Sequence, residues 1–517
     1  MPFISNLGIA FQEIAAAHAE SPALIYPESG ERISYSGLAS LAETAARHLT
    51  RLGYGKGTVI ALFHDKSPGA FGAMLACLRL GITYTNLDPE SPWERLRKII
   101  TNCSPSAVIN AFPGLPHCDS IKTASLCDVI DLKSLLVPLL EPVALPDIRE
   151  VCGGTPSYIM FTSGSTGQPK GAVMSHANLL WFIAWGRERF GISPEDVFTN
   201  VNPIYFDNSV FDFYTAIFSG AALVPLTPAQ ARDSKLTVRL VNESRCTIWF
   251  SVPSLLVYLL TTRALGDTDL PTIRKIIFGG EGFPKAKLKT LFDMFGDRAE
   301  LENVYGPTEC TCICSAKKVN SEDFSDMQNL TPLGNLSQNF GGGILLLDEA
   351  DPDFGELFLS GPHVGLGYFN DPDRTRQSFV QDPTHNLYSD ICYRTGDLVR
   401  RDARGWLHFK GRADFQIKHM GYRIELEEIE SALNTLPDVK ECAVIYRKMG
   451  EGLGQIIGFA AMDHARCSDA LVQEVAAIVS PYMVPRKIHV MPALPKNANG
   501  KIDRPALAGF AEAGKEF

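Results

Sequence analysis

Residues 158–176 read Tyr158-Ile-Met-Phe-Thr-Ser-Gly-Ser-Thr-Gly-Gln-Pro-Lys-Gly-Ala-Val-Met-Ser-His176. This stretch is a short apolar run followed by a loop of small and hydroxyl-bearing residues with one lysine. Glycines let a backbone approach an anion closely, hydroxyls donate hydrogen bonds, and the lysine adds a positive charge. The loop therefore predicts a cradle for a polyphosphate, formed by Thr162, Ser163, Gly164, Ser165, Thr166, Gly167 and Lys170.

Two other interpretations compete with a polyphosphate cradle. The simpler one is a flexible, hydroxyl-rich turn without a ligand. A Walker-type loop is disfavoured, because no Gly-Lys-Ser or Gly-Lys-Thr follows a glycine at the required spacing.

The composition is that of an ordinary soluble globular protein, with 45% hydrophobic and 21% charged residues. A chain of 517 residues exceeds what one core usually supports, so two or more domains are expected. The net charge of −10 argues against a partner that is nucleic acid or an anionic membrane, because binding these needs a basic surface. No uncharged run reaches transmembrane length, and the N-terminus does not resemble a signal peptide.

The twelve cysteines are scattered without the spacing of a zinc site. We therefore expect reduced thiols in a cytoplasmic protein. Cys310, Cys312 and Cys314 alternate, and this period of two predicts an ordinary strand.

Short β-rich runs alternate with helical patterns and predict layers of α/β structure; examples are Val59-Ile-Ala-Leu-Phe63, Thr247-Ile-Trp-Phe-Ser251 and Lys275-Ile-Ile-Phe278. The pattern changes after residue 413, where a helix with an acidic first turn is followed by two strands, a helix and a strand. We predict a large, multi-layered α/β domain over residues 1–413 and a small α+β domain over residues 414–517.

The polyphosphate loop resembles the signature of the adenylate-forming superfamily, which includes acyl-CoA synthetases, luciferases and the adenylation enzymes of nonribosomal peptide synthesis. Further blocks resemble the family's motifs in the family's order along nearly the whole chain. They are Tyr205-Phe-Asp-Asn-Ser-Val-Phe211, Asn303-Val-Tyr-Gly-Pro-Thr-Glu309, Gly355-Glu-Leu-Phe-Leu-Ser-Gly361, Tyr393-Arg-Thr-Gly-Asp397, Gly411-Arg-Ala-Asp-Phe-Gln-Ile-Lys418, Gly421-Tyr-Arg-Ile-Glu425 and Asn499-Gly-Lys-Ile-Asp503.

This resemblance implies that the chain binds ATP and Mg²⁺. The loop would wrap the β- and γ-phosphates, Thr308 would contact the α-phosphate, and Glu309 would help to bind Mg²⁺. Tyr305 would pack on the adenine, and Arg412 would contact the nucleotide. Asp397 would accept both ribose hydroxyls, since the two oxygens of a carboxylate match a vicinal diol.

The resemblance gives Lys501 the catalytic role in adenylation, together with Thr308 and Glu309, as a flexible charge between the carboxylate and the α-phosphate. It also implies that the small domain is mobile, with its hinge at Asp414, and that Gly421 leaves room for a phosphopantetheine arm. The alternatives are a surface lysine at 501, a turn aspartate at 414 and a turn glycine at 421.

Asp207 occupies the position where amino-acid-activating members hold the substrate's α-ammonium. A carboxylate buried without a counter-charge is costly, which favours a substrate that carries an ammonium. The family's pocket positions correspond to Asp207, Asn208, Phe211, Phe250, Ile277, Gly279, Val304, Cys312, Ile313 and Lys501. Most are apolar, so we expect a small or medium apolar amino acid such as alanine, proline or valine, with Gly279 opening one wall. Core packing is the alternative for these apolar residues.

Within the superfamily the chain looks similar to stand-alone D-alanine:carrier-protein ligases, although those have a cysteine where this chain has Gly279. No carrier segment follows Lys501, so we expect the phosphopantetheine to arrive on a separate carrier protein or as coenzyme A. Two alternative functions remain: an acyl-CoA synthetase that uses a non-amino acid, and a non-catalytic protein that binds an amino acid or nucleotide. Asp207 counts against the first, and intact Lys170, Glu309 and Lys501 count against the second.

Overall fold

The computed structural model describes residues 4–141, 143–164, 167–336, 341–346, 351–414, 416–448, 454–464, 466–497 and 502–513. The chain divides into two compact units. The first comprises Met1–Leu87, Cys103–Phe161 and Gly171–Ala413, and the second comprises Asp88–Asn102, Thr162–Lys170 and Asp414–Phe517. The expected α/β fold class is confirmed. The predicted domain boundary after residue 413 stays a prediction, and the second unit includes two earlier segments that no sequence pattern had linked to it.

Two large sheets form the frame of the first unit. The first has the strand order β17-β8-β7-β4-β3-β5-β6, and the second has the order β14-β13-β12-β11-β9-β10-β1-β2. The strands of the first are β3 (Val59–Phe63), β4 (Thr83–Leu87), β5 (Ala107–Asn110), β6 (Asp128–Asp131), β7 (Pro156–Thr162), β8 (Lys170–Ser175) and β17 (Gly367–Tyr368). Those of the second are β1 (Pro22–Tyr26), β2 (Glu31–Ser34), β9 (Val197–Asn200), β10 (Ala222–Pro225), β11 (Ile248–Ser251), β12 (Lys275–Gly279), β13 (Glu300–Tyr305) and β14 (Ser315–Lys318).

The three β-rich runs found in the sequence are confirmed as β3, β11 and β12. Each pairs in parallel with its neighbours in the large sheets, which buries both faces of the strand and explains the continuous apolar runs.

Helices flank these sheets, and α3 (Pro68–Leu80) shows how local sequence sets their ends. Ser67 accepts a hydrogen bond from the backbone of Ala70, Pro68 occupies the first turn, and Gly81 ends the helix with a φ of 68°. These are the preferred residues at the two ends of a helix. The other helices of the frame are α1 (Leu7–Ala17), α2 (Tyr35–Arg51), α5 (Pro116–Thr123), α6 (His176–Phe190), α8 (Pro228–Arg232), α9 (Ser234–Glu243), α10 (Pro253–Thr261) and α11 (Lys285–Phe295).

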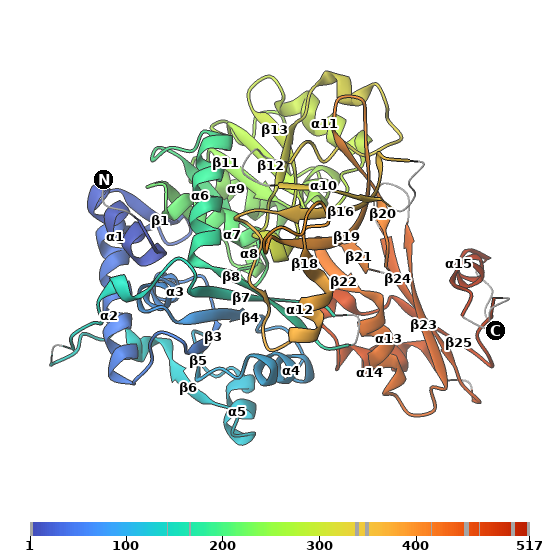
Figure 1. Ribbon diagram of the computed structural model, residues 1–517, viewed down its shortest axis with the longest axis horizontal. Coiled ribbons are helices and arrows are strands. Elements are labelled where there is room, and N and C mark those ends of the chain that lie inside the picture. The colour runs from blue at the N-terminus through green and yellow to red at the C-terminus, as the bar shows by residue number, and fades with distance from the viewer. Residues whose placement is uncertain are drawn as a thin grey trace. The chain divides into compact units, whose positions relative to one another are not determined.

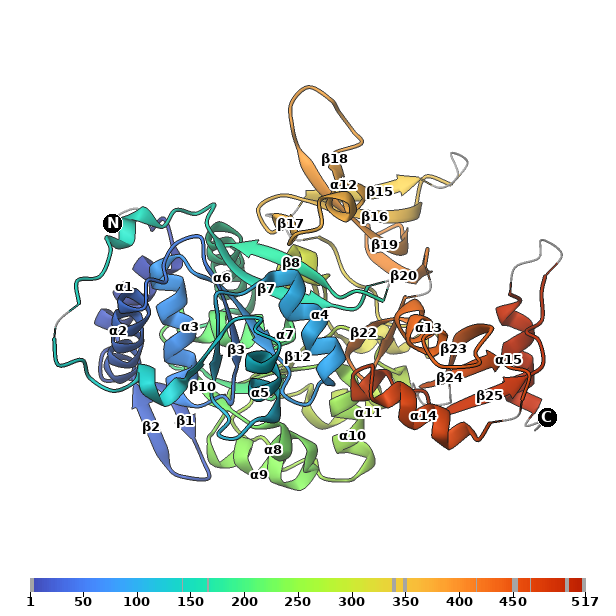
Figure 2. The same cartoon turned by 90° about the horizontal axis from the view of Figure 1, so that it is seen from below.

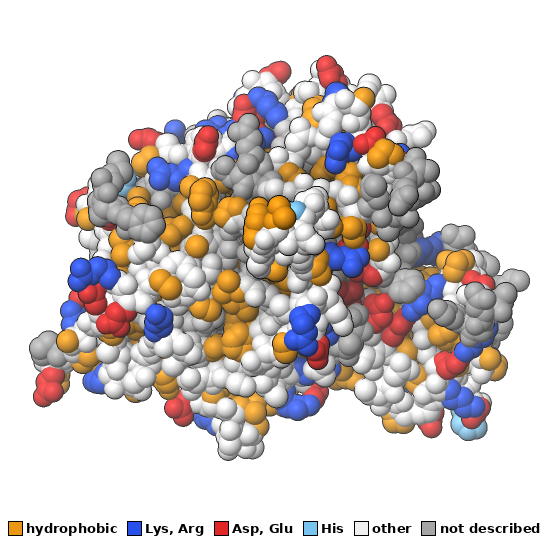
Figure 3. Space-filling model, in the orientation of Figure 1, with side chains coloured by type: hydrophobic (Ala, Val, Ile, Leu, Met, Phe, Trp, Pro, Cys, Tyr) orange, Lys and Arg blue, Asp and Glu red, His pale blue; other side chains and the backbone are white. Residues whose placement is uncertain are grey.

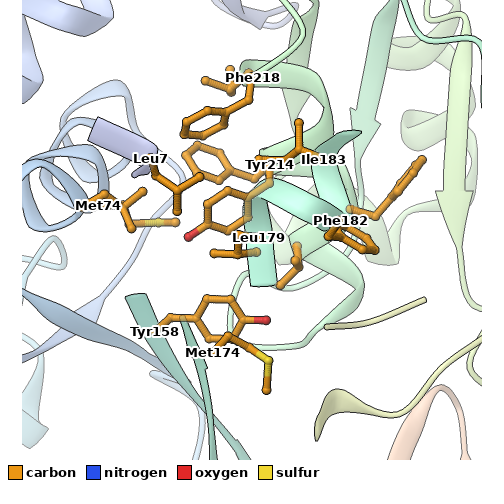
Figure 4. Packing of buried hydrophobic residues seen from close by; sticks show 14 of the residues in the cluster. Leu7, Met74, Tyr158, Met174, Leu179, Phe182, Ile183, Tyr214 and Phe218 are labelled. Atoms are coloured by element: carbon orange, nitrogen blue, oxygen red, sulfur yellow. The ribbon is translucent and has the colours of Figure 1, made fainter. Parts of the chain in front are cut away.

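The main core of the first unit lies where helices α1, α3 and α6 meet strand β7 and a π-helical segment, η3 (Phe211–Thr215). Figure 4 shows Leu7, Met74, Tyr214 and Phe218 gathered there. Figures 1 and 2 both show α1, α2 and α3 side by side. This packing fixes η3 and the short helix α7 (Asn208–Val210) that precedes it, and these carry predicted pocket residues.

A smaller antiparallel sheet completes the first unit (Figure 2). Its strand β19 pairs with β20 so that Asp397 lies opposite Arg412. The sheet consists of β15 (Gly341–Leu346), β16 (Phe354–Ser360), β18 (Phe379–Gln381), β19 (Ile391–Arg401) and β20 (Leu407–Arg412), with helix α12 (Pro372–Ser378) before β18.

In the second unit, the predicted order of helix, two strands, helix and strand is confirmed. The elements are α13 (Leu426–Asn434), β23 (Glu441–Lys448), β24 (Gly454–Ala461), α14 (Ser468–Ala476) and β25 (Lys487–Met491), with α15 (Arg504–Ala513) following. A hairpin of β21 (Gln416–His419) and β22 (Tyr422–Glu425) precedes α13, and α4 (Trp93–Cys103) lies almost wholly in the same unit.

Charges of both signs are interspersed over the face drawn in Figure 3. Among the helices of the described residues, none combines the length and apolar character needed to cross a membrane.

Candidate functional site

Three of the predicted nucleotide contacts of the first unit, Tyr305, Arg412 and Asp397, are joined by hydrogen bonds. The Tyr305 hydroxyl donates a hydrogen bond to Asp397 Oδ2 at 2.5 Å, and Arg412 Nη1 donates to Asp397 Oδ1 at 2.7 Å. Tyr305 ends β13 and Arg412 ends β20, so these two strand ends hold a carboxylate that is only 3% exposed. A carboxylate offers about four acceptor positions, and each oxygen therefore keeps capacity for a ribose hydroxyl.

Asp207 and Thr308 are in direct contact. Thr308 Oγ1 donates to Asp207 Oδ2 at 2.5 Å. Asp207 directly precedes α7, whereas Thr308 begins the short 3₁₀ segment that follows β13. The structure thus joins the predicted ammonium-binding carboxylate to the hydroxyl predicted to contact the α-phosphate. Asp207 is half-buried rather than buried, which lowers the cost of its charge below the sequence-based expectation.

Glu309 is fully buried, and its Oε1 accepts a hydrogen bond from the Tyr368 hydroxyl at 2.7 Å. Tyr368 lies on β17, 59 residues further along the chain, and the sequence analysis did not identify it. No local pattern could have done so, since the contact depends on β17 pairing with β8.

Within the described residues, no group of three or more His, Cys, Asp or Glu side chains could hold a metal by itself. Mg²⁺ in nucleotide sites is commonly bound by one or two carboxylates together with phosphate oxygens. A single buried carboxylate at Glu309 fits that mode of binding.

The predicted pocket residues surround the Asp207 segment with apolar side chains. The Phe211 and Phe250 rings meet edge to face with centroids 5.2 Å apart, and both are at most 2% exposed. Asn208 is partly exposed, but its Nδ2 is buried and has no hydrogen-bond partner among the described residues. The remaining predicted residues, Ile277, Val304, Cys312 and Ile313, are buried.

Gly279 does not leave the open wall that the sequence analysis expected. A Cβ placed at residue 279 would lie 2.4 Å from the carbonyl oxygen of Val304 and 2.6 Å from Val304 Cγ2. Gly279 and Val304 face each other across β12 and β13. The absence of a side chain at residue 279 therefore allows the two strands to approach closely. A larger residue would collide with the backbone of β13.

The strand expected at Cys310, Cys312 and Cys314 was wrong. Thr308–Cys310 is a 3₁₀ turn, and Thr311 and Cys312 have φ values of 55° and 75°. Two consecutive non-glycine residues in the left-handed region are a strained arrangement that occurs at functional sites. The Thr311 hydroxyl holds the turn by donating to the carbonyl of His363 at 2.8 Å.

This turn brings Cys312 near Asp207. Burial and, after it, the Asp207 carboxylate raise the pKa of the Cys312 thiol well above its ordinary value. The thiol is therefore neutral and acts as a small apolar side chain beside the carboxylate.

The described part of the phosphate loop belongs to the second unit, where other residues of that unit occupy its donors. Ser163 Oγ donates to the carbonyl of Arg423 at 2.7 Å, and the Gly164 amide donates to Glu428 Oε2 at 3.3 Å. Lys170 Nζ lies 3.6 Å from Glu425 Oε1. Thr162 Oγ1 is buried without a partner among the described residues. The loop thus binds carboxylates through the groups predicted to bind phosphates.

The second unit also contains the other predicted residues, three of which belong to this loop. Asp414 is exposed and begins the third segment of the unit. Gly421, with a φ of 81°, follows Met420, with a φ of 52°, in the two-residue turn between β21 and β22. Positive φ at both positions explains the glycine by turn geometry. Gly167 is described, whereas Ser165, Thr166 and Lys501 lie outside the described residues.

Two family models match the chain: the AMP-binding enzyme model over residues 11–369 and the AMP-binding enzyme C-terminal domain model over residues 428–501. An L-proline--[L-prolyl-carrier protein] ligase of Pseudomonas fluorescens is 33% identical over 93% of this chain and 95% of its own length. A D-alanine--D-alanyl carrier protein ligase of Listeria monocytogenes is 32% identical, with the same coverage. The adenylation domain AlmE of Vibrio cholerae has a similar fold, with a TM-score of 0.81 and 22% identity over 99% of both chains.

The family expected from the ordered motifs is confirmed by these matches. The first family model covers more than half of the sequence, and both ligases align along almost their whole length. This chain therefore belongs to the AMP-binding enzyme family, within the adenylate-forming superfamily.

Proposed function

We propose that this enzyme activates an amino acid with ATP to give an aminoacyl-AMP, and then transfers the aminoacyl group to the phosphopantetheine thiol of a separate carrier protein. The two ligases that match almost the whole chain act, by name, on amino acids and carrier proteins. Their identities of 33% and 32% support the reaction type more strongly than the particular amino acid.

The contact between Asp207 and Thr308 carries the proposal. An α-amino acid has its ammonium and its carboxylate bonded to the same carbon atom. If Asp207 holds the ammonium and Thr308 holds the α-phosphate, their separation of 2.5 Å sets the substrate carboxylate beside the α-phosphorus. Holding two reactants in this way accounts for a large part of the rate of many enzymes.

The first step would join a carboxylate oxygen to the α-phosphorus, while the bond to the β-phosphate breaks and pyrophosphate leaves. In the second step, a thiolate would attack the acyl carbonyl and AMP would leave with the electron pair of the acyl–oxygen bond. Asp397, Tyr305 and Arg412 would hold the ribose and adenine. Mg²⁺, held by Glu309 and phosphate oxygens, would offset the charge of the phosphates.

The phosphate loop would bind the β- and γ-phosphates through Ser163, Gly164 and Lys170. Its present contacts support this role, since the Gly164 amide and the Lys170 ammonium already face the carboxylates of Glu428 and Glu425. Phosphate oxygens are acceptors of the same charge and would replace these carboxylates.

A small or medium apolar side chain is the proposed specificity. Phe211 and Phe250 close the region beyond Asp207 with two buried rings, and neutral Cys312 adds no charge. Asn208 Nδ2 provides one hydrogen-bond donor at the same place. Proline and alanine, named for the two ligases, are within this size range. The reaction is proposed to take place in the cytoplasm.

Amino-acid-dependent exchange of pyrophosphate into ATP tests the first half-reaction. The panel would contain all proteinogenic, D- and β-amino acids, with fatty and aryl acids to test the acyl-CoA synthetase alternative. Exchange with one or a few small apolar amino acids is expected. Exchange only with non-amino acids would contradict the proposal, and absence of exchange throughout would favour a non-catalytic binder. Thioester formation on a phosphopantetheinylated carrier, followed by intact mass, tests the second half-reaction.

A further inference from the structure

A buried lysine and a buried aspartate connect the two large sheets of the first unit next to the predicted pocket. Lys66 follows β3 and is 4% exposed, and Asp212 lies in η3 and is fully buried. Neither residue belongs to the motifs of the sequence analysis. A buried charge is costly unless it is paired and hydrogen-bonded, so each needs an explanation.

The Lys66 ammonium is saturated with hydrogen bonds. It donates to the carbonyls of Asn200, Asn202 and Leu226 at 2.7, 2.8 and 2.8 Å. An ammonium has three donors, and here all three bind backbone that leaves the ends of β9 and β10. The backbone of Lys66 has a φ of 63°, a left-handed conformation that favours glycine. The three hydrogen bonds of its ammonium explain why a lysine occupies this position.

Asp212 holds the same two asparagines from the other side. Its Oδ2 accepts hydrogen bonds from Asn200 Nδ2 at 3.1 Å and from Asn202 Nδ2 at 2.9 Å. Burial lowers the pKa of Lys66 and raises that of Asp212, while the charge of each opposes the shift of the other. The lysine therefore binds the backbone carbonyl of each asparagine, and the aspartate binds the side-chain amide of each.

One hydrogen bond and one peptide bond connect this cluster to the predicted pocket. Asn202 Nδ2 also donates to the carbonyl of Phe250 at 3.0 Å. Asp212 directly follows Phe211, whose ring contacts the Phe250 ring. The cluster thus fixes the distance between the segment that carries Asp207 and Phe211 and the strand that carries Phe250.

We propose that Lys66 and Asp212 are positioning residues for recognition of the amino acid, which act through Asn200 and Asn202 without touching the substrate. This inference rests on the proposed function, since it takes the Asp207 segment and Phe250 as the walls of the substrate pocket. Loss of either charge would let the Asp207 segment move relative to Phe250, while Tyr305 and Asp397, which bind the nucleotide, belong to other strands.

The test compares Lys66→Met, Asp212→Asn and the double variant with the wild type by pyrophosphate exchange, using whichever carboxylic acid, amino or not, gives the fastest wild-type exchange. Lys285→Met is the matched control, because Lys285 is also buried and its ammonium also donates to backbone carbonyls, those of Asp323 and Asp326. The melting temperature of each variant is measured. Lys66→Arg is a further variant that retains the charge but cannot present three donors in the same geometry.

Each single variant is expected to lose about ten- to a hundredfold in kcat/KM for the acid substrate, the scale of a misplacement of about 1 Å. The KM for ATP should stay within about twofold of wild type, since ATP contacts are not displaced. The double variant should be no worse than the weaker single variant, because the two residues act as one unit. Lys285→Met should lower the melting temperature without this selective loss.

The positioning role would be overturned if Lys66→Met and Asp212→Asn impaired the use of the acid substrate and of ATP equally. It would also be overturned if these variants only lowered the melting temperature. Failure of the proposed function has a different signature. In that case the wild type would exchange pyrophosphate only with non-amino acids, and the ratio of the two KM values would still test the positioning role with that acid.

Discussion

Thr308 Oγ1 donates a hydrogen bond to Asp207 Oδ2 at 2.5 Å, although 101 residues separate them in sequence. One side chain would face the ammonium of the substrate and the other the phosphate under attack. Their contact couples the choice of substrate to the reacting phosphorus, and variants at either residue should therefore affect different kinetic parameters.

Asp207→Ala should reduce amino-acid-dependent exchange by about ten- to a hundredfold, the worth of a hydrogen bond to a charged group on a half-buried residue. ATP affinity, measured by calorimetry, should change little. Asp207→Asn is the matched control, because its amide oxygen can still accept from Thr308 while the charge is lost. Retention of amino-acid turnover in both variants would show that Asp207 does not bind the ammonium.

In the proposed reaction the Thr308 hydroxyl turns its one hydrogen from Asp207 to the α-phosphate. Thr308→Val should therefore lower kcat for exchange by about a hundred- to a thousandfold, as expected when one donor to a transition state is lost. Thr308→Ser keeps the hydroxyl and should retain most of the activity. The comparison is made at saturating amino acid and ATP. If Val and Ser variants had the same kcat, the hydroxyl would have no part in the chemical step.

Gly279→Ala should destabilise the protein by about 1–3 kcal/mol, the usual cost of overpacking. The added Cβ would be 2.4 Å from the carbonyl oxygen of Val304, and that backbone cannot move freely. Gly154→Ala serves as control, since an added Cβ there meets nothing within 4 Å. Denaturant unfolding gives both values, and equal stabilities would contradict the close approach of the two strands.

Lys501→Ala should reduce adenylation by about a hundred- to a thousandfold, while thioester formation from preformed aminoacyl-AMP is retained. The reason is that its charge is needed only when the α-phosphate is attacked. Lys496→Ala provides the control, because this nearby lysine is paired with Glu441 at 2.6 Å. Equal losses in both half-reactions of the Lys501 variant would rule out a role confined to adenylation.

Patterns of short range in the sequence predicted much of the fold. The apolar runs Val59-Ile-Ala-Leu-Phe63 and Lys275-Ile-Ile-Phe278 specify β3 and β12 by local rules. The same kind of reasoning failed at Cys312, because the period-two pattern is compatible with a strand and nothing local reveals the left-handed backbone.

The candidate site depended on contacts between distant segments, and these were predictable only through the family resemblance. Asp207, Thr308 and Asp397 could be named in this way. Lys66 and Asp212 could not, since a lysine after a strand looks like a surface residue, and its partners lie more than a hundred residues away. The same limit applied to residue 279, because the close approach of strand β13 is the reason for a glycine there.

The most direct test of the central claim compares each amino acid with the same acid lacking its amino group, in wild-type pyrophosphate exchange. Proline is paired with cyclopentanecarboxylic acid, and alanine with propionic acid. We expect exchange with the amino acid of at least one pair and about a tenfold or greater loss with its partner, because an unpaired Asp207 loses a charged hydrogen bond. Equal or faster exchange with the acids that lack the amino group would contradict it.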